Sequence, residues 1–302
     1  MAIFNRVKPI PENEAEGEIE RVYHEIRQTL RVTGTPQMFR HWAAYGTFLP
    51  MVWEAFRSNA ESRAFEAASD RLRAEAARSV APLGKPNVPA RVRLGESQTY
   101  HLCASLDLYY YLYPKLLALT SAVQLALGGE RVGKEETGEI ARIERGAPAG
   151  MIAMELSPEE PQDPRLRALF DEFKKHSNLP AASDDVRTLA LWPDYLVEAR
   201  KRLKPILAGA ASPQAAERLR ERARSEARAL PYPVPLSWEK VKAIGQDVEA
   251  IAALTGRFEQ ACLRCILDIA LLERDWRDTE ALVSSPFPAP PRRQAAAAEE
   301  AR

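Results

Sequence analysis

The sequence has few of the residues on which metal, disulfide and phosphate-binding proteins depend. Its 302 residues include three cysteines and four histidines, and the histidines show none of the spacings of a zinc site. Three cysteines fit a reducing compartment, where a disulfide framework is not expected. Gly-rich phosphate loops and a GxSxG elbow are absent too. We therefore expect neither a metal nor a cofactor.

The sequence also has no excess of basic or acidic residues and no long apolar run. The chain has 42 basic and 42 acidic residues, which argues against binding of nucleic acid. Residues 1–17 lack the apolar core of a signal peptide, and no stretch approaches the roughly 20 apolar residues of a membrane span. The sequence predicts a cytoplasmic protein that binds a small molecule rather than nucleic acid or membrane.

What the sequence does contain is a gapless internal repeat with an offset of 147 positions. The offset pairs Arg40 with Arg187, and residues 71–73 (RLR) with residues 218–220 (RLR). Chance would not hold one register over so long a stretch, and a repeat of this kind decides the fold. We predict a tandem duplication of one helical unit that forms a pseudo-dimer within the chain.

Apolar residues in both copies follow the period of a helix. In copy one they recur at steps of three and four from Ile19 to Leu30, and copy two repeats the stripe from Leu166. Sustained strand-like alternation is absent, so the predicted fold class is all-α. A second helix is expected over residues 39–56 and again over 186–203. The most apolar segments, 99–127 and 248–273, are predicted to be the central helices.

The predicted boundaries follow from composition. Repeat 1 covers residues 1–130 and repeat 2 covers residues 165–283. Residues 131–164 are polar and contain Gly and Pro, which is typical of a linker. The tail, residues 284–302, is rich in Pro and Ala and is predicted to be disordered.

The copies differ chemically at the start of the second helix. Copy two has Ser183-Asp184-Asp185 where copy one has Pro36-Gln37-Met38. Ser and Asp in front of an apolar run are ordinary helix caps, although a cap needs only one side chain. The alternative is that Asp185 points between the copies as a general base, toward Pro36, Phe39 and the central helices.

Two further motifs each allow two interpretations. Pro114 lies inside a predicted helix and should free the carbonyl of Tyr110, so the surrounding tyrosines form either a kinked core helix or the wall of a pocket. Cys262 and Cys265 form a CxxC. They are either buried, inert thiols or a redox pair.

With these motifs the chain resembles the group I, non-stereospecific 2-haloacid dehalogenases over nearly its whole length up to the tail. The resemblance is carried by the duplication, by SDDVRTLALWPDYL from Ser183 and by YLYPKLLAL from Tyr111. It implies one active site between the halves and hydrolysis of both enantiomers of small 2-haloalkanoic acids, with inversion at C2 and without a cofactor. The expected partner is this small carboxylate substrate, and a homodimer stays open.

The resemblance also implies roles for residues. Asp185 matches the aspartate that activates water for direct attack on carbon, without an ester intermediate. Tyr110 falls where the family has a water-holding asparagine. We expect the substrate carboxylate to bind at the helix start of copy one, residues 37–40. The full set of predicted substrate-binding residues is Pro36, Phe39, Tyr110, Tyr113, Asp184 and Thr188.

Two other functions remain open from the sequence. The first is an AhpD-like thiol reductase that uses Cys262 and Cys265, although Ile269 stands where that motif has a histidine. The second is a ligand-binding protein without catalysis, because Tyr110 replaces the expected asparagine.

Overall fold

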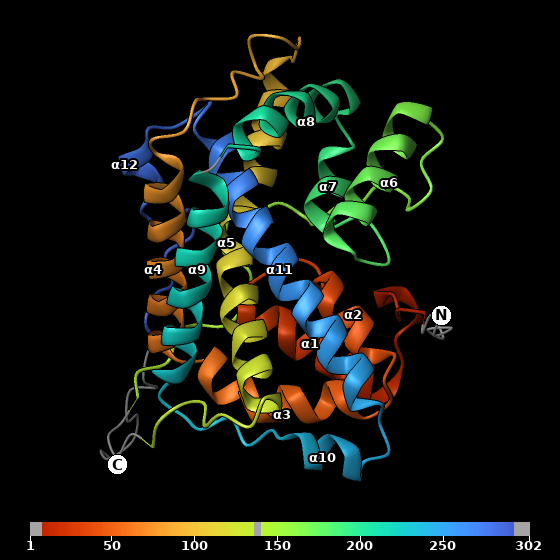
Figure 1. Cartoon of the computed structure of the whole chain (residues 1–302), viewed down its shortest axis with the longest axis vertical. Coiled ribbons are helices and arrows are strands. Elements are labelled where there is room, and N and C mark those ends of the chain that lie inside the picture. Colours follow the sequence, from red (N-terminus) through yellow and green to blue (C-terminus); the bar gives the residue numbers. More distant parts are fainter. Residues whose placement is uncertain (1–7, 136–139, 210, 293–302) are drawn as a thin grey trace, which may run out of the picture.

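The secondary structure is helical. A computed structural model describes residues 8–135, 140–209 and 211–292 (Figure 1). Within these ranges the only β-type pairs are isolated bridges, such as Ser62 with Arg142, and the all-α prediction is confirmed. No helix in the described ranges is long and apolar enough to cross a membrane.

The helices of the two halves follow one another in a similar order. After a 3-10 turn (Glu12–Glu14), the α-helices are α1 (Gly17–Leu30), α2 (Gln37–Ala43), α3 (Phe48–Ala60), α4 (Arg63–Val80), α5 (Glu96–Leu127), α6 (Pro164–Ser177), α7 (Asp184–Leu189), α8 (Pro193–Leu207), α9 (Ala211–Arg228), α10 (Trp238–Ala243), α11 (Val248–Glu273) and α12 (Thr279–Leu282). Both ends of α1 and α6 are 147 positions apart, and so are the starts of α2 and α7. The duplication itself stays an interpretation of the sequence.

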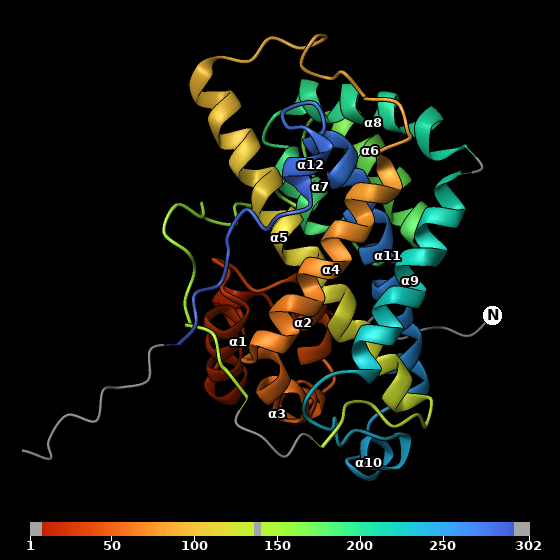
Figure 2. The same ribbon diagram turned by 90° about the vertical axis from the view of Figure 1, so that its left-hand side faces the viewer.

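The centre of the molecule is the pair α5 and α11, which make the most extensive contact between any two helices described. Both are buried on most sides because their sequences are apolar on most sides. Helices α4 and α9 pack against this pair and against each other, on the side that faces the viewer in Figure 2. Helices α1–α3 lie at one end of the molecule and α6–α8 at the other.

The expected second helix of each copy is in fact two helices. In copy one the break between α2 and α3 contains Gly46, whose φ of +54° is a left-handed conformation that suits glycine. In copy two, Pro193 is the first residue of α8, a position where a missing N–H removes no helical hydrogen bond. The prediction of one continuous helix was therefore wrong at both places.

Pro114 has the predicted effect on the backbone of α5. The carbonyl of Tyr110, four residues earlier, accepts a hydrogen bond of 3.2 Å from Nε of Arg73. Arg73 is fully buried, so a charged donor from α4 replaces the helical N–H that proline lacks. This contact ties α4 to the central helix.

The first part of the predicted disordered tail is ordered. Phe287 lies with its ring edge-on to Tyr111, 5.6 Å between centroids, and Arg292 N–H donates to the carbonyl of Arg142 at 2.8 Å. Figure 2 shows this segment descending from α12 toward α1. Residues 284–292 thus pack on the first half, which corrects the prediction, and residues 293–302 lie outside the described ranges.

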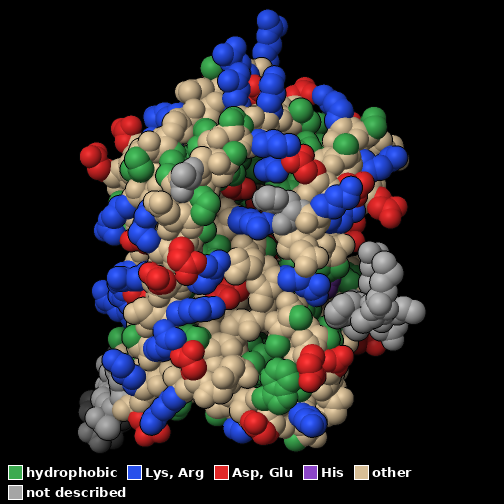
Figure 3. Space-filling model, in the orientation of Figure 1, with side chains coloured by type: hydrophobic (Ala, Val, Ile, Leu, Met, Phe, Trp, Pro, Cys, Tyr) green, Lys and Arg blue, Asp and Glu red, His purple; other side chains and the backbone are tan. Residues whose placement is uncertain are grey.

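Charged side chains of both signs are mixed on the surface. Over most of the face seen in Figure 3, Lys and Arg lie among Asp and Glu, as the equal numbers of basic and acidic residues lead one to expect. Several basic side chains stand together at the upper end of this view.

Candidate active site

Asp184 and Asp185 are adjacent at the start of α7 and both are buried, yet they serve different neighbours. Asp184 reaches the other half of the chain. Its Oδ2 accepts a hydrogen bond of 2.7 Å from the backbone N–H of Gln37, and its Oδ1 pairs with Arg40. The carboxylate therefore caps α2, at a position 147 residues from its own. The site that we expected to hold a substrate carboxylate, residues 37–40, is filled by Asp184 instead.

Asp185 lies against α5 and α11 instead of α2. Its Oδ1 accepts a hydrogen bond of 2.5 Å from the hydroxyl of Tyr113 on α5 and lies 3.7 Å from Sγ of Cys265 on α11. Burial raises the pKa of the Asp185 carboxyl, while hydrogen bonds from Ser183 and Tyr113 act in the opposite direction. The outcome is a buried carboxylate of increased basicity, held in place by hydroxyl groups.

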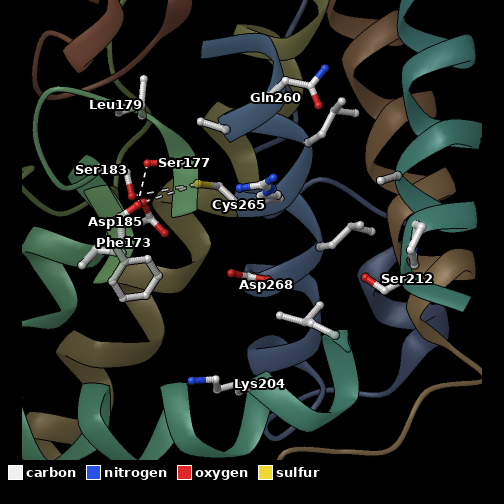
Figure 4. A pocket seen from close by; sticks show the side chains of 18 of the residues that line it. Phe173, Ser177, Leu179, Ser183, Asp185, Lys204, Ser212, Gln260, Cys265 and Asp268 are labelled. Carbon is white, nitrogen blue, oxygen red and sulfur yellow. Dashed lines mark hydrogen bonds between the residues drawn. The ribbon is translucent and has the colours of Figure 1, made fainter. Parts of the chain in front are cut away.

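A large pocket opens beside Asp185. It has a volume of about 760 Å³ and is lined by residues of α6, α7, α8, α9 and α11 (Figure 4). All of these helices belong to the second half of the chain. Tyr113 is the first-half residue whose hydrogen bond reaches Asp185.

A second, narrow pocket does lie between the halves. Its volume is about 20 Å³, which is room for about one water molecule. Tyr113 and Asp184 line it together with Ser183 and Cys265. Ser183 and Cys265 also line the large pocket, so the two spaces meet at the side chains around Asp185.

Asp268 is a further carboxylate of the large pocket that was not predicted from the sequence. Asp268 lies on α11, one helical turn after Cys265, and lines the same pocket as Asp185. Burial first, and then the charge of Asp185, raise the pKa of Asp268 to about 7, against the effect of Arg200 and Arg264. The 147 offset pairs Asp268 with Ser121, so the comparison of copies that singled out Asp185 could have found it.

The other predicted site residues lie elsewhere. The hydroxyl of Tyr110 donates to the carbonyl of Leu282 at 2.7 Å. Thr188 Oγ1 is bonded to Tyr109 and to the carbonyl of Glu155, and Thr188 lines a separate pocket of about 590 Å³ between the first part of α5 and the end of α7. Pro36 and Phe39 are buried and line none of the pockets described above. Of the predicted set, Tyr113 contacts Asp185 and Asp184 lies beside it. Tyr113, one turn after Tyr110, is thus the tyrosine that contacts Asp185.

The CxxC does not have the properties of a redox pair. Cys262 and Cys265 are both buried and not in a disulfide. Burial, the largest cause, and nearby carboxylates raise the pKa of both thiols, whereas a reactive cysteine needs an accessible thiolate. In the described ranges, His, Cys, Asp and Glu side chains form no group that could hold a metal ion.

Known proteins share this sequence pattern and this fold. The profile of one protein family, described as halocarboxylic acid dehydrogenase DehI, matches residues 33–186, about half of the chain. The chain belongs to the DehI family. The match includes the start of α2, the whole of α5 and the aspartates of α7.

Curated relatives of this DehI protein are 2-haloacid dehalogenases, which are hydrolases acting on carbon–halide bonds. A configuration-inverting 2-haloacid dehalogenase of Pseudomonas sp. (strain 113) is 28% identical over 84% of this chain and 85% of its own length. An (R)-2-haloacid dehalogenase of Rhizobium sp. (strain NHG3) is 26% identical over 78% and 92%. The structure of a D-2-haloacid dehalogenase mutant superposes with a TM-score of 0.78 at 20% identity, covering 88% of this chain and 94% of that one.

Replacing Asp184 should destabilise the protein but leave the large pocket, which Asp184 does not line, unchanged. Asp184→Asn removes the charge that pairs with Arg40, whose side chain is 12% exposed, and loss of one partner of such a largely buried pair costs about 3 kcal/mol of unfolding free energy. Denaturant unfolding followed by circular dichroism measures the loss. Asp194→Asn is the control, because Asp194 pairs with Arg165 on the surface and should change little. Equal stability of the two variants would show that Asp184 does not hold the halves together.

Asp268 should make stability depend on pH. Its pKa in the folded protein, about 7, lies above the ordinary value of 3.8, so its favourable contribution is complete below pH 4 and is lost as the pH rises through 7. Asp268→Asn removes this dependence. We expect the thermal midpoint of the variant, relative to the parent, to be higher at pH 8 than at pH 5. Parallel pH curves for the two proteins would contradict the raised pKa.

Proposed function

We propose that the protein hydrolyses 2-haloalkanoic acids, with Asp185 as the base that activates water. The observation that carries the proposal is the buried Asp185 carboxylate, which is held by the Tyr113 hydroxyl at the wall of a large pocket. A carboxylate of raised pKa in a water-poor site is a competent general base near neutral pH. Membership of the DehI family and the dehalogenase relatives support the reaction type.

In the proposed reaction Asp185 removes a proton from a water molecule, and the water oxygen bonds to C2 of the substrate. The carbon–halogen bond breaks on the opposite side, so halide leaves and the configuration at C2 inverts. Asp185 lines the large pocket, from which this water reaches its carboxylate. No bond forms between Asp185 and the substrate, and no ester intermediate is involved.

The substrate carboxylate needs positive charge, which the filled site at α2 cannot provide. Arg200 and Lys204 of α8 line the large pocket, and both contact Glu172, at 2.7 and 3.4 Å. We assign the carboxylate of the substrate to these two side chains. A planar guanidinium can bind a second carboxylate oxygen while it keeps a partner.

The proposal includes turnover of both enantiomers. The pocket is much larger than a halopropionate, which leaves room for the C2 substituents in either arrangement. The named specificities of the relatives differ: that of Pseudomonas sp. (strain 113) is named only for inversion, whereas that of Rhizobium sp. is named for the (R) form. Halide release from (R)- and (S)-2-chloropropionate, with chiral analysis of the lactate, tests both range and inversion. Turnover of one enantiomer alone would restrict the proposed activity to that enantiomer.

Asp185→Asn should abolish halide release, because an amide cannot accept the proton of water. We expect kcat to fall about 10³-fold, while the helical circular dichroism stays unchanged. Asp194→Asn, an exposed carboxylate of the same half, is the matched control and should keep full activity. Halide release at the parent rate in Asp185→Asn would exclude this residue as the base. No release by the parent from any haloacid, with carboxylate binding intact, would favour the non-catalytic alternative.

A single turnover in ¹⁸O-labelled water, with enzyme in excess, separates direct attack from an ester. Direct attack places the label in the product hydroxyl at once. An ester mechanism would take the first product oxygen from Asp185 and leave the label in the protein, which mass spectrometry detects.

Tyr113→Phe should shift the pH dependence of the reaction. The hydrogen bond from Tyr113 lowers the pKa of Asp185, so its loss raises that pKa further. Because the base must be ionised, the acid limb of kcat/KM should move to higher pH. Tyr110→Phe is the control: it removes a similar hydroxyl that bonds to Leu282 and should leave the limb in place. An unmoved limb in Tyr113→Phe would show that this hydroxyl does not tune the base.

A further inference from the structure

Aromatic residues occupy first-half positions that correspond to the lining of the large pocket. At the positions related by the 147 offset, Val186, Arg200 and Ser212 line the pocket, whereas the first half has Phe39, Trp53 and Phe65. These three aromatic side chains are almost fully buried. The rings of Phe39 and Trp53 lie edge-on at 6.2 Å, and Phe65 packs on Phe56 at 5.3 Å. The second half is thus hollow where the first half is filled.

The hollow is elongated and begins at the base. Figure 4 shows Asp185 at one side, Asp268 on α11 in the middle and Ser212 of α9 at the far side. The lining also includes Phe173, Leu207, Ala216, Leu263 and Leu267. A halopropionate carries only a methyl group at C2, and it would leave most of a pocket of about 760 Å³ to water.

The charged side chains that line the pocket indicate which kind of substituent it can bind. Four acidic and four basic side chains line it, so charge of neither sign dominates the lining and selects a second ionic group on the substrate. Asp268, in the middle, has a pKa raised to about 7, and its protonated form tolerates an apolar neighbour. An alkyl chain is the substituent that matches this lining.

We propose that the pocket binds the alkyl chain of a medium-chain 2-haloalkanoic acid, with C2 at Asp185 and the chain running along α11 toward Ser212. This inference rests on the proposed function and adds its substrate class. The contacts to the chain are apolar and each added methylene removes more surface from water, so binding should strengthen stepwise until the chain reaches α9.

The test compares halide release from 2-bromopropionate, 2-bromohexanoate and 2-bromooctanoate. We expect kcat/KM to rise about threefold for each added methylene, as burial of apolar surface predicts. Ser212→Phe restores the aromatic residue that the first half has at this place. It should reduce kcat/KM for 2-bromooctanoate more than tenfold and leave that for 2-bromopropionate within twofold.

Ala211→Phe is the matched control, because Ala211 is the neighbouring, exposed residue of α9 and does not line the pocket. It should keep the preference for long chains. If Ser212→Phe fails to fold, Ala216→Leu narrows the same end of the pocket with less added volume. Release from 2-bromopropionate without any gain for longer acids would overturn the inference and leave the proposed function standing. Release from none of the three acids would overturn the proposed function itself.

Discussion

The structure depends on one buried ion pair between the halves. Asp184, at the start of α7, caps the start of α2 and pairs with Arg40, so the two short helices meet at their N-terminal ends. A buried carboxylate is tolerated because backbone N–H groups, a guanidinium and the positive ends of helix dipoles surround it. This contact fixes the start of α7, and therefore the direction in which the next side chain, Asp185, leaves the helix.

Two adjacent aspartates therefore have separate roles because their partners differ. Asp184 has a permanent positive neighbour and serves the architecture. Asp185 has hydroxyl and thiol neighbours instead of a cation, so burial raises its pKa. If the carboxylates of Asp184 and Asp185 pointed in the same direction, the negative charge of each would oppose ionisation of the other. Neither carboxylate could then be both stably ionised and strongly basic. The helix turns them apart, which lets one be a structural anion and leaves the other available for proton transfer.

The sequence predicts the helical class and the central helices well, because both follow from apolar periodicity. It singles out Asp185 because the copies differ there. The tyrosine that contacts Asp185 was harder to assign. Tyr109, Tyr110, Tyr111 and Tyr113 are all buried, and a helix that is buried on every side has no polar face that would show which tyrosine points toward Asp185. The large pocket was not predicted, because its walls depend on which of several aromatic positions are filled, and this is a three-dimensional property of packing.

That packing explains how two halves with a similar order of helices can differ in their interiors. Phe39, Trp53 and Phe65 fill the first half, and the segment after α12 covers part of it through Phe287. Dense packing of aromatic rings stabilises that half, which can then act as a rigid support that delivers Tyr113 to the other half through α5. The second half has no aromatic ring at the corresponding positions, where Val186, Arg200 and Ser212 line the pocket. The stability lost there is the physical condition for a pocket, and the shared central helices α5 and α11 let one half compensate for the other.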